Sequence, residues 1–264
     1  MRIPILLVTL LIAGCSGLAP EPQDGPGRVI DDPMAIPDAE PQDMPLSQYG
    51  NPERYEVFGR TYRVMDSADD HRERGIASWY GRKFQGRRTS SGEPYDMYAM
   101  TAAHKHLPLP TWVEVRHLDN NRSIVVKVND RGPFADNRII DLSYAAAAKL
   151  GMLDTGTAPV AIRTVTAGEA SEPAEEPADG NESDYWIQLA AFRSAGNAER
   201  LAKRLRAAEL SATPTIRQGE DGLHRVRLGP LPDADSVDRL SAELDSARFP
   251  AGHVIIPDKP SQSD

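Results

Sequence analysis

The chain contains a single cysteine, Cys15, among its 264 residues, so no disulfide can form within it. It is also poor in basic residues: 30 Lys and Arg stand against 39 Asp and Glu, which gives a formal net charge of -9 and an isoelectric point near 5.2. Nucleic-acid binding needs a basic face that neutralises phosphates. We therefore expect no nucleic-acid partner.

The N-terminal apolar run, Ile3 to Ile12, is far shorter than the roughly 20 residues that a membrane-spanning helix needs. Preceded by one cation, Arg2, it is typical of a signal peptide, which we place at residues 1–14. Its end, Ile12-Ala13-Gly14-Cys15, resembles the bacterial lipobox, in which the cysteine is diacylated and becomes the first mature residue. Cys15 is therefore a predicted lipid anchor, with a plain secretory signal and an incidental cysteine as the alternative. The following Ser16, in place of Asp, resembles the signal for export to the outer membrane.

Low-complexity segments divide the rest of the chain. Residues 15–45 are rich in Pro, Asp, Glu, Gly and Gln, which predicts a disordered tether. Residues 167–184 hold seven acidic residues and no basic one, which is typical of an extended linker that keeps its neighbours apart. Residues 257–264 are a predicted disordered tail. Between these segments lies first a hairpin segment at residues 46–74, in which Phe58-Gly59-Arg60 separates two strand-like runs. Two domains follow, at residues 75–166 and 185–256.

The domain at residues 75–166 has short strand-like runs separated by Gly and Pro, and one alanine-rich helix from Ser143 to Leu150, a pattern typical of a small β-barrel. The run from Ser123 to Val128 leads to Asp130, and Gly132-Pro133 then makes the chain turn. Neighbouring strand side chains point to opposite faces, so Arg131 should not neutralise Asp130. Taken alone, this pattern is more typical of an Asp that caps a turn.

Five motifs of this domain occur in order: Gly75-Ile76-Ala77-Ser78-Trp79-Tyr80-Gly81, Thr89-Ser90-Ser91-Gly92-Glu93, Thr101-Ala102-Ala103-His104-Lys105, Leu107-Pro108 and Asn129-Asp130-Arg131-Gly132-Pro133-Phe134. Together they resemble the rare lipoprotein A (RlpA) family over roughly residues 49–165. The resemblance implies a six-stranded double-psi β-barrel, septal-ring lytic transglycosylase activity and an active site formed by Glu93, His104 and Asp130. Gln85 and His106 stand where the family often has His and Thr.

Glycosidic cleavage needs a carboxylic acid that protonates the leaving oxygen, with a pKa raised enough to keep its proton near neutral pH. We assign this role to Asp130, which then serves as base when the 6-hydroxyl of muramic acid attacks its own anomeric carbon and forms a 1,6-anhydro end. Glu93 is the second carboxylate, expected across one groove from Asp130, with His104 beside one of them. The alternative for Glu93 is a solvated loop glutamate, and the alternative for His104 is a structural histidine. The pair His104-x-His106 lacks cysteine partners and a tight His/Asp cluster, so we expect no metal and no other cofactor.

Further glycan-binding residues are predicted near these acids. Trp79 and Tyr80 face opposite sides of a strand, so one should line a sugar groove while the other fills the core. Arg131 is predicted to hold a carboxylate or acetamido group of the glycan, with an ion pair to Asp141 or Glu114 as the alternative.

From Tyr185 onward the sequence repeats at a spacing of 39 residues, which predicts strand, helix and strand twice over. The expected fold is a ferredoxin-like α+β sandwich with four strands on one side and two helices on the other. Residues 185–192 followed by 225–230 resemble the SPOR domain, which binds glycan strands stripped of stem peptides. Alternation places the candidate glycan-binding residues on the open face of the sheet: Trp186, Gln188, Arg225 and Arg227. The alternatives are a solvated face with an incidental tryptophan, and an RNA-binding sheet, which an exported acidic protein fits poorly.

We therefore expect a mainly β protein with an α+β second domain, present as a monomeric outer-membrane lipoprotein that faces the periplasm and is anchored by the lipid on Cys15. Its barrel is expected to cut denuded peptidoglycan strands endolytically between MurNAc and GlcNAc. Its SPOR domain is expected to hold it at the division septum, where divisome proteins are further candidate partners. Two alternatives remain: a non-catalytic glycan-binding lipoprotein similar to expansins, which share the barrel, and a septal scaffold.

Overall fold

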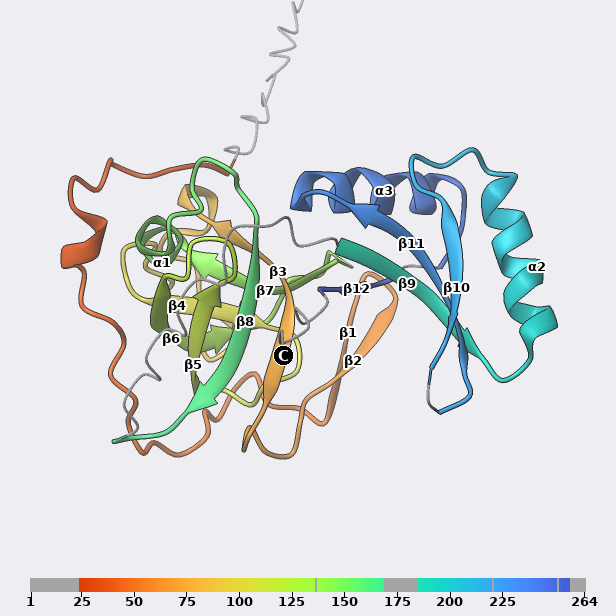
Figure 1. Ribbon diagram of the computed structural model, residues 1–264. Coiled ribbons are helices and arrows are strands. Elements are labelled where there is room, and N and C mark those ends of the chain that lie inside the picture. The colour runs from red at the N-terminus through yellow and green to blue at the C-terminus, as the bar shows by residue number, and fades with distance from the viewer. Residues whose placement is uncertain (1–23, 136, 169–184, 220, 251, 257–264) are drawn as a thin grey trace, which may run out of the picture.

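The computed structural model describes residues 24–135, 137–168, 185–219, 221–250 and 252–256, which form two packed domains (Figure 1). The predicted signal peptide, the lipid anchor at Cys15, most of the acidic linker and the C-terminal tail lie outside these residues. Within the described part of the chain, no helix has the length and apolar character needed to cross a membrane.

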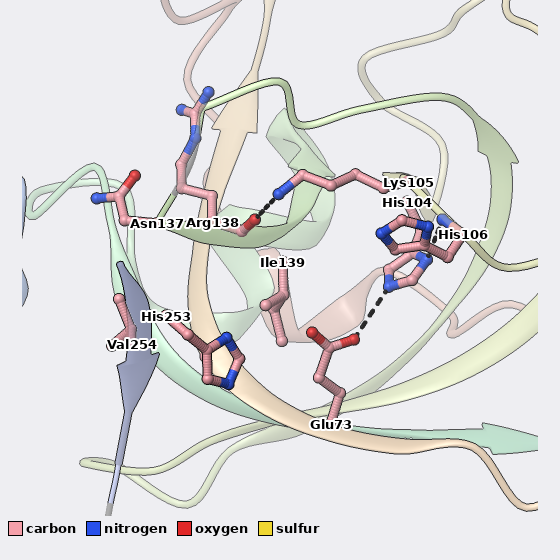
Figure 2. Close-up of a pocket in the computed structure, with 10 residues that line it drawn as sticks. Glu73, His104, Lys105, His106, Asn137, Arg138, Ile139, His253 and Val254 are labelled. Carbon is pink, nitrogen blue, oxygen red and sulfur yellow. Dashed lines mark hydrogen bonds and ion pairs between the residues drawn. The ribbon is translucent and has the colours of Figure 1, made fainter. Parts of the chain in front are cut away.

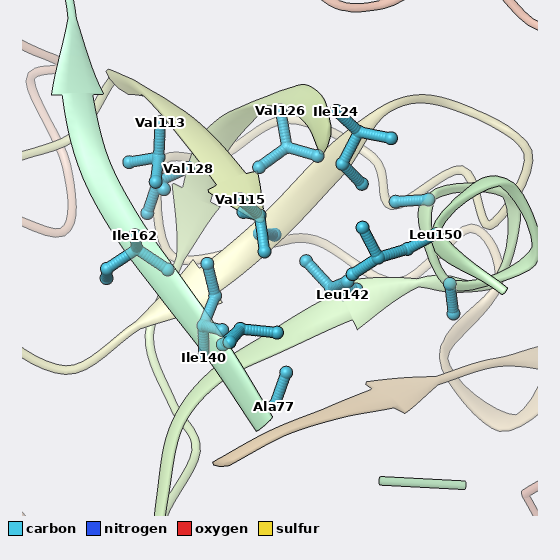
Figure 3. Packing of buried hydrophobic residues seen from close by; sticks show 14 of the residues in the cluster. Ala77, Val113, Val115, Ile124, Val126, Val128, Ile140, Leu142, Leu150 and Ile162 are labelled. Carbon is cyan, nitrogen blue, oxygen red and sulfur yellow. The ribbon is translucent and has the colours of Figure 1, made fainter. Parts of the chain in front are cut away.

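The first domain is a closed barrel of six strands, as expected. The strands are β3 (Arg72–Tyr80), β4 (Thr101–His104), β5 (Thr111–His117), β6 (Ser123–Asp130), β7 (Arg138–Ser143) and β8 (Ala158–Val165). They close in the order β3-β7-β4-β6-β5-β8, with β3–β7 and β4–β6 paired in parallel and the other neighbours antiparallel. Because successive side chains alternate between faces, one apolar face of each strand fills the interior, with Val113, Val126, Ile140, Leu142 and Ile162 among the core residues (Figure 3).

A short helix, α1 (Tyr144–Leu150), packs against the barrel core through buried alanines. It begins because the Ser143 hydroxyl accepts a hydrogen bond from the Ala146 amide, and it ends at Gly151, whose φ of 80° suits a residue without a Cβ. Two 3-10 turns, η1 (Pro33–Ala35) and η2 (Arg82–Phe84), and a hairpin of β1 (Arg54–Val57) and β2 (Arg60–Arg63) complete the domain.

The segment that precedes the hairpin differs from its sequence-based interpretation as a free tether. Most of residues 24–45 are irregular, but they are bound to the barrel. The Lys149 ammonium donates to the Ile36 carbonyl at 2.6 Å and to Asp38 at 2.7 Å, and the Ala39 amide donates to the Val125 carbonyl at 3.0 Å. Apolar side chains of this segment also pack on the core, which offsets the entropy of ordering a polar segment.

The second domain has the predicted repeat. Its elements are β9 (Tyr185–Phe192), α2 (Ala195–Arg206), β10 (Pro214–Gln218), β11 (His224–Leu231), α3 (Ala234–Ser246) and β12 (His253–Ile255), and its sheet order is β10-β11-β9-β12. Ile187 and Val226 are buried with Leu205 and Leu240 of the two helices. Trp186 and Gln188, which flank Ile187, and Arg225 and Arg227, which flank Val226, therefore occupy the open face, as alternation predicts.

The two domains share a hydrophobic contact, which contradicts the expectation that the acidic linker keeps them apart. Ile76 of β3 is 0% exposed and belongs to the same cluster as Tyr185 and Ile187, whereas its neighbour Ala77 points into the barrel core. β12 lies against β3 (Figure 1), and the Asn137 side-chain amide donates to Asp238 across the same boundary. The charge pattern of the linker does not reveal this contact, because it depends on which barrel strand turns an isoleucine outward.

We expect Ile76→Ala to lower the free energy of unfolding of the full chain by about 2–5 kcal/mol, since it removes apolar surface from a closed interface and leaves a cavity. Urea denaturation measures this change. Val29→Ala is the control, because Val29 is 83% exposed and should change stability by less than about 0.5 kcal/mol. Equal, small effects of the two substitutions would contradict the domain contact.

Candidate active site

The motif at residues 89–93 forms a closed loop along the end of β6. The Thr89 amide donates to the Glu93 carbonyl at 2.8 Å, and the Gly92 amide donates to the Thr89 carbonyl at 2.9 Å. Gly92 has a φ of 91°, which requires a residue without a Cβ. The Ser91 amide then donates to the Asn129 carbonyl at 3.1 Å, which aligns the loop with the strand. This pairing places the loop that carries Glu93 along the strand that ends at Asp130.

Asp130 is the last residue of β6 and is held through one carboxylate oxygen. Its Oδ1 accepts hydrogen bonds from the Ser90 amide at 2.8 Å, the Ser90 hydroxyl at 2.7 Å and the Arg131 amide at 2.8 Å. Within the described residues, no donor reaches Oδ2. The half-buried residue thus caps its turn, as the conservative interpretation predicted, through one of its two oxygens.

Glu93 is held in its ionised form beside the same strand. Its carboxylate accepts from the Lys127 ammonium at 2.5 Å and from the Asn129 side-chain amide at 2.8 Å. Lys127 and Asn129 are two residues apart, so both point toward Glu93. Burial by itself raises the pKa of Glu93, but the hydrogen bonds from Lys127 and Asn129 and the charge of Lys127 outweigh it and lower the pKa below its ordinary value. Glu93 therefore carries a negative charge at neutral pH, which makes it unsuited to donating a proton.

An open groove of about 410 Å³ reaches this ion pair. It runs between the N-terminal segment and the barrel and is lined by residues 36–40, 42 and 44 and by Tyr98, Ala99, Met100, Thr101, Trp112 and Lys127. Neither acid is among the lining residues, but Lys127 connects the groove to Glu93. The sequence motifs do not identify this groove, because the N-terminal segment supplies about half of its lining residues.

Within the described residues, the His104 side chain makes no hydrogen bond to Glu93 or Asp130. Its side chain is 1% exposed, and its Nδ1 accepts from the amides of His106 at 3.1 Å and Leu107 at 3.0 Å. The proton of the neutral ring must then be on Nε2, which lies 3.4 Å from Glu73 Oε2 in a second cavity of about 160 Å³ (Figure 2). His104 therefore shapes the loop that follows β4, and a direct catalytic contact is not what this geometry provides.

The Glu73 carboxylate also lies 3.3 Å from His71 Nε2. Burial raises the pKa of Glu73, but hydrogen bonds from His104 and His71 outweigh it and hold the pKa well below its usual range. Burial lowers the pKa of His104, and Glu73 only partly opposes this effect. A neutral imidazole thus donates to an ionised carboxylate.

His71, Glu73 and His104 place three ligand-type atoms within 4.8 Å of one another, so we tested them as a metal site. A histidine that binds a metal through one nitrogen usually donates a proton from the other. Nδ1 of His104 instead accepts two amide protons, which leaves Nε2 protonated and without a lone pair for a cation. The chemistry of this cluster is that of a hydrogen-bond network.

Arg131 makes four hydrogen bonds inside the protein, in contrast to its predicted contact with glycan. Its guanidinium donates to the carbonyls of Gly50 at 2.9 Å, His104 at 3.1 Å and Leu107 at 2.5 Å, and to Asn51 Oδ1 at 3.1 Å. The alternative ion pairs are not formed either, because Asp141 lies against Arg138 and Glu114 against Arg163. Sequence proximity to Asp130 was a misleading signal, because buried carbonyls compete for the same donors.

Of the two aromatic residues on β3, neither is a free sugar platform. Tyr80 is 8% exposed and stacks on Tyr95 at 4.3 Å, so it belongs to the core. Burial, with a smaller contribution from the charge of Asp130, raises the pKa of Tyr80 well above its ordinary value. Trp79 is half-buried and packs against Tyr144 at 5.7 Å.

The open face of the second domain carries the predicted residues, all of them half-buried. The Arg227 guanidinium donates to Gln188 Oε1 at 3.2 Å, and Arg225 pairs with Asp221 at 2.6 Å. Arg217, which the repeat did not single out, lies over the Trp186 ring at 5.6 Å because β10 pairs with β11. The face is therefore an aromatic ring among three guanidinium groups.

Comparison with known proteins agrees with this architecture. Residues 72–162 match the family described as lytic transglycolase, and residues 181–256 match the SPOR domain. Among solved structures, the SPOR domain of RlpA from Pseudomonas aeruginosa is 28% identical and covers 28% of this chain and 99% of its own, with a TM-score of 0.24. A Streptomyces papain inhibitor is also 28% identical and covers 38% of this chain and 99% of its own, with a TM-score of 0.33. Fold and site define a lytic transglycosylase barrel followed by a SPOR domain.

Two curated relatives extend the match to nearly the whole chain. The endolytic peptidoglycan transglycosylase RlpA of Vibrio cholerae serotype O1 is 41% identical over 252 residues, which cover 94% of each chain. The protein of the same name from Pseudomonas aeruginosa strain UCBPP-PA14 is 35% identical over an alignment of 331 positions. The match covers 96% of this chain and 95% of that protein. This chain belongs to the RlpA family of lytic transglycosylases.

Replacing Lys127 with Met should shift the acidic limb of the pH–activity profile to higher pH. The substitution removes the hydrogen bond and the charge that lower the pKa of Glu93, so the carboxylate loses its charge at a higher pH as the solution is acidified. Product release from peptidoglycan strands, measured across a pH series, tests this. Lys127→Arg is the matched control because it keeps the positive charge, and an unchanged acidic limb in Lys127→Met would contradict a role for ionised Glu93.

Proposed function

We propose that this protein cleaves the bond between MurNAc and GlcNAc within denuded glycan strands and leaves 1,6-anhydro-MurNAc ends. The observation that carries this proposal is the pairing of Asp130, fixed through Oδ1 with Oδ2 open, with Glu93, which Lys127 keeps ionised on the same strand end. Two carboxylates in different environments are the arrangement that acid–base cleavage of a glycoside requires.

In the proposed reaction Asp130 protonates the glycosidic oxygen while the bond from that oxygen to C1 of MurNAc breaks. The negative charge of Glu93 stabilises the positive charge that develops on the sugar ring. The 6-hydroxyl of the same MurNAc then forms a bond to C1 and returns its proton to Asp130. The proton balance closes without a water molecule, so a single acid that regains its proton is sufficient.

Asp130→Asn should lower the yield of anhydro-muramyl ends by at least about 100-fold, because an amide of nearly the same shape cannot give up a proton. Mass spectrometry of digested denuded glycan measures these ends. Asp66→Asn is the control, since the Asp66 side chain is 89% exposed and lies outside the site. A normal yield from Asp130→Asn would reject the assigned acid, and absence of anhydro ends with the unsubstituted protein would favour the expansin-like alternative.

We further propose that Cys15 carries a lipid that anchors the protein in the outer membrane on its periplasmic side, and that the SPOR domain concentrates it at the division septum. Support comes from the lipobox-like sequence and from the open face, on which Trp186 lies near the guanidinium of Arg217 and Gln188 near that of Arg227. A rigid ring flanked by hydrogen-bond donors suits the apolar face and the hydroxyl groups of a sugar. Divisome proteins are further proposed partners of a protein held there.

The combined substitution Trp186→Ala and Gln188→Ala should abolish septal enrichment of a fluorescent fusion and leave the rate on soluble denuded strands within about twofold, because the open face does not contact Asp130. Arg206→Ala is the control, as Arg206 is exposed on α2, in the helical layer opposite the open face. Septal enrichment that persists in the double variant would show that another surface directs the protein to the septum.

A further inference from the structure

An aromatic cluster joins the β1–β2 hairpin to the loop that follows Asp130. The Phe134 ring lies 5.5 Å from Tyr62, 6.3 Å from Tyr55 and 6.4 Å from Phe58, measured between ring centroids. Tyr55 and Tyr62 stack on each other at 5.3 Å, and both are at least partly buried. Three of these four rings are therefore explained by packing, and Phe58 is the exception.

Phe58 violates two local rules at once. It is a large apolar residue at the tip of the hairpin, yet it is 89% exposed. It also has a φ of 51°, followed by Gly59 at 74°, a two-residue turn in which Asn, Asp or Gly is strongly preferred at the first position. A bulky residue in this conformation is strained, and exposure means that little burial offsets the cost. Such an outlier is a reason to look for a function of the side chain.

The hairpin is fixed to the catalytic loop, so Phe58 has a defined position relative to Asp130. The Tyr55 hydroxyl donates to the Lys105 carbonyl at 2.8 Å, and the Arg131 guanidinium lies over the Tyr55 ring at 5.8 Å. Phe134 is only four residues beyond Asp130. An exposed aromatic face is thus held beside the loop that carries the acid.

We propose that Phe58, supported edge-on by Phe134, is a stacking subsite for a sugar ring of the glycan strand, outside the barrel and on the hairpin that packs against the loop after Asp130. Sugar rings have an apolar C–H face that packs on an aromatic ring. A single exposed ring is far too small for a protein partner, which needs roughly 800 Å² on each side, and is the right size for one sugar. The inference rests on the proposed cleavage of glycan strands.

Phe58→Asn tests the proposal sharply because Asn is favoured in this turn and should preserve or raise the melting temperature. With soluble denuded strands as substrate, we expect KM to rise about fivefold with little change in kcat, the loss expected for one stacking contact. Phe58→Trp should recover most of the lost affinity, because it keeps an aromatic face. Val29→Asn, at an exposed apolar position away from the hairpin, is the control and should change neither value.

A second measurement separates this inference from the proposed reaction. Full-length protein carrying Asp130→Asn and Trp186→Ala lacks the assigned acid of the barrel and the aromatic ring of the open face. The remaining binding of denuded oligosaccharides to this protein is measured by calorimetry. Weaker binding after Phe58→Asn supports the subsite even if the unsubstituted protein fails to cleave. Unchanged KM and unchanged binding overturn it, as does a lower melting temperature that accompanies the loss of affinity, because that result assigns Phe58 to holding the hairpin.

Discussion

The position of the loop that follows Asp130 depends on the guanidinium of Arg131. Its fork binds backbone carbonyls of the segment before the hairpin and of the loop after β4, so three stretches of chain meet at one side chain. Buried carbonyls without donors are costly, and only arginine offers five donors in one rigid plane. The imidazole of His104 supports the same loop from the other side by accepting two of its amide protons. The loop that carries Asp130 is consequently placed by side chains whose polar atoms bind the protein's own backbone.

The two acids differ because their surroundings differ. Glu93 has a cation and an amide directed at its oxygens, whereas Asp130 has its donors on one oxygen only. This asymmetry keeps Glu93 charged and leaves Oδ2 of Asp130 without a protein donor among the described residues, so the two acids can take different roles in the proposed cleavage. The loop at residues 89–93 creates the asymmetry, since Ser90 binds one acid and Glu93 is the other.

Much of the fold follows from local pattern. The 39-residue repeat predicts the sheet and its helices, and alternation places Trp186 and Gln188 on the open face correctly. The family resemblance implies the six-stranded barrel, and the alternation before Gly132-Pro133 predicts that Asp130 lies at the end of a strand. The incorrect expectations concern contacts between distant segments: His104 with Glu73, Arg131 with carbonyls, and the docking of residues 24–45 on the barrel. Each contact depends on which of several polar or apolar groups packs or bonds most favourably with the same partner.

The sequence by itself determined the elements of this protein: the strand periods, the glycine turns, the repeat and the acidic, polar segments between domains. These follow from side-chain alternation and from backbone angles that few residues adopt. Only the tertiary structure decided that Ile76 faces the second domain, that Lys127 keeps Glu93 charged and that an exposed Phe58 stands beside the loop of Asp130. Each of these contacts joins segments that lie far apart in the sequence, and no local pattern encodes which of them meet.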